Sequence, residues 1–310
     1  MSEEELLKLI ERMERRIKRA YRNFVRRSRA SVGQRATERA LRDGTIPQLT
    51  EIVRNEVDRF ANEVSQLPIA VAGTLATSTG TTFDVTDPQV AARLLQARQR
   101  IVSSLARDVV QQMTLGVQLG PQVTIRSRAL ALRESIGLNE QQLRATANFE
   151  RLLREGNTDA LSRKLRDRRF DGTILGAIRR DEPLTEDQIN RMVSRYRERQ
   201  INYRAGVIAQ VESLRQVGEG DEAFWGQKVS DGTFDANQIF RRWVTQRDER
   251  VRGSHAALHG TVQPLGTDFI SGDGNTLRFP GDPRAPASET VNCRCMLATR
   301  VRGQAKKMAA

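Results

Sequence analysis

The chain has two cysteines and two histidines, and all four lie near its C-terminal end. Cys293 and Cys295 are separated by one residue in the segment NCRC, and His255 and His259 are four residues apart in SHAALHG. A strand would place both thiols on one face, and a helix would place both imidazoles on one face. Thiolate and imidazole are ligands that zinc prefers, so the four residues can form a tetrahedral site that anchors a loop-rich domain. The alternative is ordinary packing, with the thiols as small apolar side chains.

A charged segment, DERVRGSH, leads into the histidine pair. If this segment is helical, steps of four and three align Asp248, Arg252 and His255 on one face. We therefore expect these side chains to form a buried polar network, and we assign Asn292 to the same network.

Motifs for catalysis are missing from the sequence. HAALH lacks the glutamate that a zinc-protease helix supplies as general base, and no GxSxG elbow, P-loop or dinucleotide glycine pattern is present. His255 with Cys293 or Cys295 could act as a nucleophile pair, but such sites usually have one reactive thiol near a helix N-terminus. We therefore expect a protein that is not an enzyme.

Positive charge is concentrated in two stretches of a chain whose net charge is +13. Residues 11–42 hold 12 basic and 3 acidic side chains, and residues 163–169 hold five basic side chains around Asp167. Such patches attract polyanions, which predicts binding to double-stranded DNA without sequence preference. The alternative is a solvated charged helix face. The candidate DNA-binding residues are Arg15, Arg16, Lys18, Arg19, Arg22, Arg26, Arg27, Arg163, Lys164, Arg166, Arg168 and Arg169.

The first basic stretch lies on a predicted amphipathic helix. Ser2 and Glu5 have the spacing of a capping box, which marks the helix start. Apolar residues then recur at steps of four and three and form a seam. This seam either packs within the chain or docks on another subunit. Its residues are Leu6, Ile10, Met13, Ile17, Tyr21 and Phe24.

Further helices are predicted along most of the chain. Helical patterning over residues 46–67 breaks at the Gly/Thr-rich stretch 72–85 and restarts at Asp87, with Pro88 in the first turn. From about Gly218 the composition changes to Gly, Pro, Asp and short β-prone pieces. We expect a mainly α protein with an extended helical body and a small α+β C-terminal domain. The predicted domains are a basic N-terminal helical segment (1–65), a helical body (66–217) and the α+β domain (218–310).

Apolar runs in the sequence are short. The longest, at residues 67–73, is far below the roughly 20 residues of a membrane helix. The start of the chain is acidic and helical, unlike a secretion signal, and two cysteines one residue apart would form a strained ring if bridged. We expect a soluble protein in a reducing compartment, with no membrane partner.

Two C-terminal segments, WVTQRDERVRGSHAALHGTV and FPGDPRAPASETVNCRCML, resemble the C-terminal domain of the phage Mu protein F-like head morphogenesis family. Three upstream segments are similar to the helical body of the same proteins: FDVTDPQV, KLRDRRFD and PLTEDQINRMVSRYRERQINYRAGVIAQVES. Some relatives have a histidine just before the NCRC element, which implies metal binding in those members. Residues 288–291 of this chain contain no histidine, and His259 stands where relatives commonly have Asn or Asp.

The resemblance implies a minor head protein of a tailed phage. Such a protein would lie in the capsid interior of the virion, and in the host cytoplasm during assembly. Its expected partners are the portal protein, other capsid proteins and double-stranded DNA, with a role in head assembly and in DNA packaging or genome ejection. The alternative is a virion-delivered metal-dependent enzyme or effector. Zinc is the one cofactor that the residues suggest.

Overall fold

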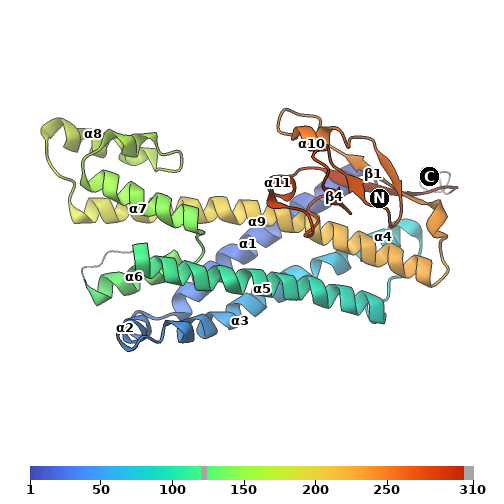
Figure 1. Ribbon diagram of the computed structural model, residues 1–310, viewed down its shortest axis with the longest axis horizontal. Helices are drawn as coiled ribbons and strands as arrows, with labels where there is room; N and C mark the ends of the chain where they lie inside the picture. The colour runs from blue at the N-terminus through green and yellow to red at the C-terminus, as the bar shows by residue number, and fades with distance from the viewer. Residues whose placement is uncertain (120–123, 304–310) are drawn as a thin grey trace. The chain divides into compact units, whose positions relative to one another are not determined.

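A computed structural model of the chain describes residues 1–119 and 124–303 (Figure 1). The predicted fold class is confirmed: the described residues are mainly α-helical, and their strands are few, antiparallel and confined to the C-terminal part. No helix in these two ranges has the length and apolar character needed to cross a membrane.

Long helices account for most of the chain before residue 231. They are α1 (Glu3–Ser31), α2 (Gln34–Asp43), α3 (Ile46–Ser65), α4 (Leu67–Thr79), α5 (Pro88–Leu119), α6 (Ile125–Ser135), α7 (Glu140–Arg154), α8 (Asp171–Arg180) and α9 (Glu186–Ser230). Two short 3₁₀ helices precede α8: η1 (Thr158–Ser162) and η2 (Arg168–Phe170).

Short elements make up the C-terminal part. They are η3 (Ala236–Gln238), β1 (Ile239–Val244), α10 (Gly253–Ala256), β2 (Val262–Pro264), β3 (Phe269–Ile270), β4 (Thr276–Leu277), α11 (Ala287–Thr290) and β5 (Met296–Val301). One antiparallel sheet has the strand order β2-β1-β5, and β3 pairs with β4 in a separate ribbon. In β1, Ile239, Arg241 and Trp243 are buried, as the alternation of a half-buried strand requires.

The chain forms two compact units, each built from separate stretches. One unit contains residues 1–20, 60–101 and 206–310, and the other contains residues 21–59 and 102–205. Several long helices therefore contribute residues to both units.

These units do not follow the predicted domain boundaries. Gly218, the predicted start of the C-terminal domain, lies inside α9. The composition changes there because neighbouring segments approach the helix closely. A Cβ on Gly218 would lie 2.2 Å from Cδ2 of Phe279, and one on Gly220 would lie 2.6 Å from the carbonyl oxygen of Pro68.

The Gly/Thr-rich stretch 72–85 was predicted to break the helical pattern, and this prediction is correct only for residues 80–85. Residues 67–79 form α4, which ends at Gly80 with φ 68°. Hydroxyl groups of Thr74 and Thr77 donate to the carbonyls of Ala70 and Gly73, four residues earlier, at 2.9 and 3.0 Å. These bonds give the two hydroxyl groups hydrogen-bond partners within the helix.

The predicted helix start and apolar seam of α1 are both present. The amide of Glu5 donates to Ser2 Oγ at 3.2 Å, and the amide of Ser2 donates to a Glu5 carboxylate oxygen at 2.6 Å. The seam is buried within this chain, each side chain being at most 5% exposed, so the intrachain alternative is correct. Docking of the seam on another subunit is withdrawn. The residues concerned are Leu6, Ile10, Met13, Ile17, Tyr21 and Phe24.

The unit of residues 21–59 and 102–205 has an apolar cluster shared by α7, α8 and the start of α9. The rings of Phe149 and Tyr196 stack there with centroids 4.4 Å apart. In the same unit, the hydroxyl of Tyr21 donates to the carbonyl of Gly137 at 3.2 Å, and the amide of Gly137 donates to Gln112 Oε1 at 2.7 Å.

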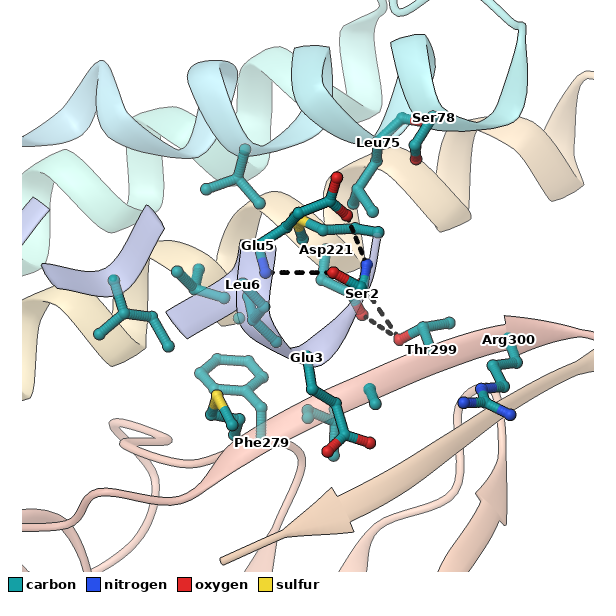
Figure 2. Close-up of a pocket in the computed structure, with 18 of the residues that line it drawn as sticks. Ser2, Glu3, Glu5, Leu6, Leu75, Ser78, Asp221, Phe279, Thr299 and Arg300 are labelled. Atoms are coloured by element: carbon teal, nitrogen blue, oxygen red, sulfur yellow. Dashed lines mark hydrogen bonds between the residues drawn. The ribbon is translucent and has the colours of Figure 1, made fainter. Parts of the chain in front are cut away.

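A cavity of about 590 Å³ lies in the unit that carries the C-terminal sheet. The start of α1, α4, the second half of α9 and the edge strand β5 surround it (Figure 2). Gly218 lines this cavity, and Phe279 closes one side.

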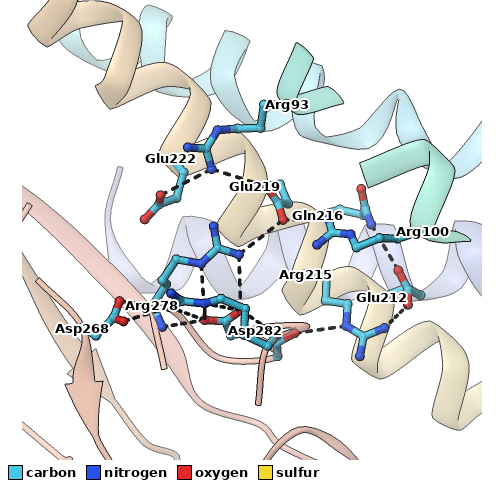
Figure 3. A network of polar contacts seen from close by, with 12 residues as sticks. Arg93, Arg100, Glu212, Arg215, Gln216, Glu219, Glu222, Asp268, Arg278 and Asp282 are labelled. Carbon is cyan, nitrogen blue, oxygen red and sulfur yellow. Dashed lines mark hydrogen bonds and ion pairs between the residues drawn. The ribbon is translucent and has the colours of Figure 1, made fainter. Parts of the chain in front are cut away.

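Arginine–carboxylate pairs connect α5, α9 and the loop after β4 in the same unit (Figure 3). Glu219 is 3% exposed and lies 2.8 Å from Arg100, 3.5 Å from Arg93 and 3.8 Å from Arg278. Since a buried carboxylate is costly unless paired, these three guanidinium groups explain how Glu219 is accommodated.

Asp282 belongs to the same group of contacts and is fully buried. Burial raises the pKa of its carboxyl, but hydrogen bonds from Arg284 and Arg278 outweigh burial and bring the pKa down to about 2. The carboxylate therefore holds the turn after β4 together through Arg278 and Arg284.

Candidate metal centre

His255, Cys293 and Cys295 come together in the C-terminal domain. The Nδ1 atom of His255 lies 3.5 Å from the Sγ of Cys293 and 3.5 Å from the Sγ of Cys295. The three possible ligand atoms lie within 4.8 Å of one another, and the side chains are 1–2% exposed. Three of the four predicted metal-binding residues therefore form one buried cluster of soft and imidazole ligands.

The backbone before β5 explains why both thiols reach the same imidazole. Asn292 has φ 59°, a left-handed conformation that asparagine tolerates better than most residues. Cys293 and Cys295 precede β5, which begins at Met296, and both thiols lie beside the same ring nitrogen. The side chain of Gln210 on α9 donates to the carbonyl of Cys293 at 3.1 Å and holds this segment in place.

Glu289 on α11 contacts the other ring nitrogen of His255. Its carboxylate lies 2.8 Å from Nε2, and both side chains are 1% exposed. Ser271 Oγ and Asn275 Nδ2 donate to the same carboxylate at 2.8 and 2.9 Å, and Ser254 Oγ donates at 3.2 Å. Burial raises the pKa of Glu289, but the hydrogen bonds from Ser271 and Asn275 outweigh it and leave the pKa lowered.

An ionised Glu289 favours a proton on Nε2 of His255. The lone pair of Nδ1 then faces the two thiols. Metal-binding histidines commonly have a carboxylate at the second nitrogen, which fixes the tautomer and the ring orientation. The surroundings of His255 therefore fit a metal ligand.

The two thiols shift each other's pKa in opposite directions. The hydrogen bond with Cys295 lowers the pKa of Cys293 well below its ordinary value, and the same bond together with burial raises the pKa of Cys295. A second thiolate in this buried site would need a cation beside it. Metal binding to both thiols would therefore release protons.

His259 does not belong to the cluster, so the predicted four-ligand His₂Cys₂ site is wrong. The helix α10 ends at Ala256, and His259 lies in the turns that follow. Its Nδ1 lies 3.1 Å from the amide of Thr245, and its Nε2 lies 2.9 Å from Nε of Arg247. Over residues 1–119 and 124–303, no fourth His, Cys, Asp or Glu joins His255 and the two thiols.

The predicted network of Asp248, Arg252, His255 and Asn292 is not a single network. Residues 248–252 are not helical, so these side chains do not share a helix face. Asp248 is exposed and pairs with Arg294, whose hydrogen bond lowers the pKa of Asp248.

Arg252 and Asn292 have separate structural roles. The Arg252 guanidinium donates to the carbonyls of Ser288 and Val291 and so fixes α11. Asn292 is exposed and acts through its backbone conformation.

The candidate DNA-binding residues of α1 are mostly exposed. Arg15 and Arg16 are 68% and 53% exposed and have only weak partners, Glu11 at 4.0 Å and Glu63 at 3.9 Å. Arg27 is half-buried and pairs with Glu56 at 2.7 Å, which makes it a poor contact for phosphate. The remaining candidates on α1 are also exposed: Lys18, Arg19, Arg22 and Arg26.

The basic stretch at residues 163–169 is largely paired within its own unit. Arg166 makes two bonds of 2.9 Å to Asp171, and Arg169 pairs with the buried Asp167 at 2.6 Å. Arg163 donates to Asn148. Lys164 and Arg168 are exposed, and in the described part of the chain they have no ion pair. This stretch therefore offers fewer free cations than its composition suggested.

Sequence reasoning missed Glu289 and its partners. Glu289 precedes Cys293 by four residues, and an acidic residue so close to a CxC pair was a signal for an outer carboxylate. Ser271 and Asn275 had no such signal, because they reach the site only through the turn between β3 and β4.

Comparisons with known proteins gave no relative. No protein-family model, no curated protein and no solved structure matches this chain.

Proposed function

We propose that this chain is a minor head protein of a tailed phage, located inside the capsid and associated with the portal. Its role would be in head assembly and in DNA packaging or delivery. The resemblance of its C-terminal segments and helical body to the Mu protein F-like family supports this proposal. The mainly helical fold with a small α+β end is compatible with it.

The DNA-facing part of the proposal depends on one observation. The exposed side chains of Lys18, Arg19 and Arg22 on α1 have no ion pair within the described ranges. Cations without protein partners can neutralise phosphates and release counterions. We assign no base-reading role to them, since phosphate contacts carry no sequence information.

A density map of the intact particle tests this function. We expect the chain inside the head, next to the portal and following its symmetry or a subgroup of it. A chain found only outside the capsid, or absent from assembled heads, would contradict the proposal.

We also propose that His255, Cys293 and Cys295 bind one zinc ion. The ligand types suit zinc, and the Glu289 carboxylate at His255 Nε2 is the arrangement expected around a bound metal. The ion would link the loop that carries α10 to the segment before β5, in a domain that has few long elements.

The same cluster is the basis of the alternative function, a virion-delivered metal-dependent enzyme or effector. Three protein ligands with an open position are typical of catalytic zinc sites. Here, however, all three side chains are 1–2% exposed, and a substrate needs access to the metal. The low exposure favours a structural ion, although Cys295 is also one of the residues that line the cavity of about 590 Å³. Zinc-dependent turnover of a substrate that also protects the cysteines from alkylation would favour the enzyme.

A further inference from the structure

The cavity beside β5 has the size and walls of a ligand site. Its volume is about 590 Å³, which lies within the range of pockets that hold small organic molecules. Apolar side chains from α1, α4, α9 and the loop after β4 form most of its wall (Figure 2). They include Leu6, Ile10, Val71, Leu75, Val217 and Phe279.

Asp221 is a buried carboxylate in this wall. Its side chain accepts from Trp225 Nε1 at 3.1 Å and from Thr299 Oγ1 at 3.2 Å, and the residue is 8% exposed. Both donors are neutral. Among the described residues, no Lys or Arg forms an ion pair with Asp221, although buried carboxylates are usually paired.

Arg241, the cation that lowers the pKa of Asp221, is already paired with other groups. The guanidinium of Arg241 pairs with Glu222 at 2.6 Å and donates to the carbonyls of Thr267 and Arg278. Burial raises the pKa of Asp221 to about 7, against the opposing effect of Arg241. Asp221 is therefore a carboxylate that a cation could stabilise.

Other charged groups of the lining have partners or lie at its edge. Glu3 pairs with Arg242, and Glu5 accepts from the amide of Ser2. Arg300 adds a positive charge to the lining. Asp221 thus differs from the other carboxylates in being both buried and without a cation.

We propose that this cavity binds a small organic cation, a primary ammonium or guanidinium group on an apolar chain. The cation contacts the carboxylate of Asp221, and the chain lies against the wall formed by α1, α4 and Phe279. A charge-assisted hydrogen bond to a carboxylate is stronger than one from a neutral donor. An alcohol of the same length should therefore bind more weakly, and a carboxylate of the same length should be repelled.

Three six-carbon probes test the proposal: hexylammonium, 1-hexanol and hexanoate. Binding to the full chain is measured by calorimetry at pH 8, where Asp221 is largely ionised. We expect hexylammonium to bind at least tenfold more tightly than hexanol, and hexanoate not to bind. Equal binding of the amine and the alcohol, preference for hexanoate, or no binding of hexylammonium at millimolar concentration would overturn the proposal.

Two variants assign the binding to this cavity. Asp221→Asn should weaken hexylammonium at least tenfold while leaving hexanol unchanged. Ser78→Trp, at the partly exposed lip of the cavity, should block both ligands without disturbing the core. Thr77→Trp is the matched control, because Thr77 is exposed on the same helix and does not line this cavity. If Asp221→Asn does not fold, the Ser78→Trp and Thr77→Trp variants still test the site. Equal binding of hexylammonium by these two variants would refute binding in this cavity.

Discussion

The Glu289 carboxylate lies 2.8 Å from Nε2 of His255, on the side of the imidazole opposite to the two thiols. Three hydrogen bonds from Ser271, Asn275 and Ser254 keep this carboxylate in place inside the domain. The carboxylate beside the imidazole is therefore positioned by residues that the sequence separates widely. A carboxylate at the second ring nitrogen is the arrangement commonly found around metal-binding histidines.

The purified chain should contain about one zinc ion, measured by elemental analysis after mild dialysis. Cys293→Ser should remove the ion and destabilise the domain by about 3 kcal/mol or more, because metal-binding energy is folding energy in such sites. His259→Gln is the matched control, and it should keep the zinc. If the metal is absent and Cys293→Ser costs only about 1 kcal/mol, the thiols are packing residues.

Glu289→Gln should lower zinc affinity roughly 10- to 100-fold, as expected when the outer partner of a metal-binding histidine is changed. The zinc content at saturation should stay near one per chain, because all three ligands remain. Competition with a chromophoric chelator measures the affinity. An unchanged affinity would mean that Glu289 supports the loop and not the metal.

Binding to duplex DNA should be independent of sequence and should weaken steeply with salt. If Arg15, Arg19, Arg22 and Arg26 each contact a phosphate, changing all four to glutamine should flatten the slope of log affinity against log salt by roughly 4, from about −0.9 per contact. Glutamine keeps helix propensity, so helix content should not change. Arg166 and Arg169, which are paired with carboxylates, provide a control pair for the same substitution. An unchanged slope in the four-site variant would mean that these residues of α1 do not contact the phosphates of DNA.

The approach of Phe279 to α9 requires glycine at position 218. Gly218→Ala should destabilise the protein by about 1–3 kcal/mol, because its Cβ would lie 2.2 Å from the Phe279 ring. In a Phe279→Ala background the same change should be neutral or stabilising, since alanine favours helix by about 1 kcal/mol over glycine. Denaturant unfolding of the four variants gives the coupling. Additive effects would show that the ring moves aside without cost.

Asp221 should make stability depend on pH between about 4 and about 7. Its pKa is raised in the folded state to about 7, so the folded chain holds a proton that the unfolded chain loses near pH 4. Stability from this group is complete below pH 4 and falls as the pH rises through 7. Arg241 and Glu222 are the charged groups that act on Asp221. Asp221→Asn should therefore gain stability relative to the wild type as the pH rises across this range; a parallel pH profile for the two proteins would contradict it.

Local patterns predicted the parts of the fold that depend on local physics. The capping box at Ser2 and the seam of α1 follow from spacing along one helix. The same reasoning failed where contacts with distant parts of the chain determine the local structure. Residues 72–79 continue α4, and α9 has a glycine where α4 approaches it.

The metal cluster shows a similar limit. His255 and His259 would share a face only if α10 continued, but it ends after Ala256. His259 instead lies within hydrogen-bond distance of the amide of Thr245 and of the guanidinium of Arg247. Glu289 reaches His255 from α11, and Ser271 and Asn275 hold its carboxylate in place. The spacing of these residues in the sequence does not predict these contacts. A count of ligand residue types could therefore suggest a metal but could not select the ligands.

The division of one unit into residues 1–20, 60–101 and 206–310 has a consequence for synthesis on the ribosome. At about 5–20 residues per second, roughly ten to forty seconds pass between release of the first stretch and arrival of the last. During this interval Ile10 and Ile17 lack part of their eventual surroundings and are open to chaperones or to other nascent chains.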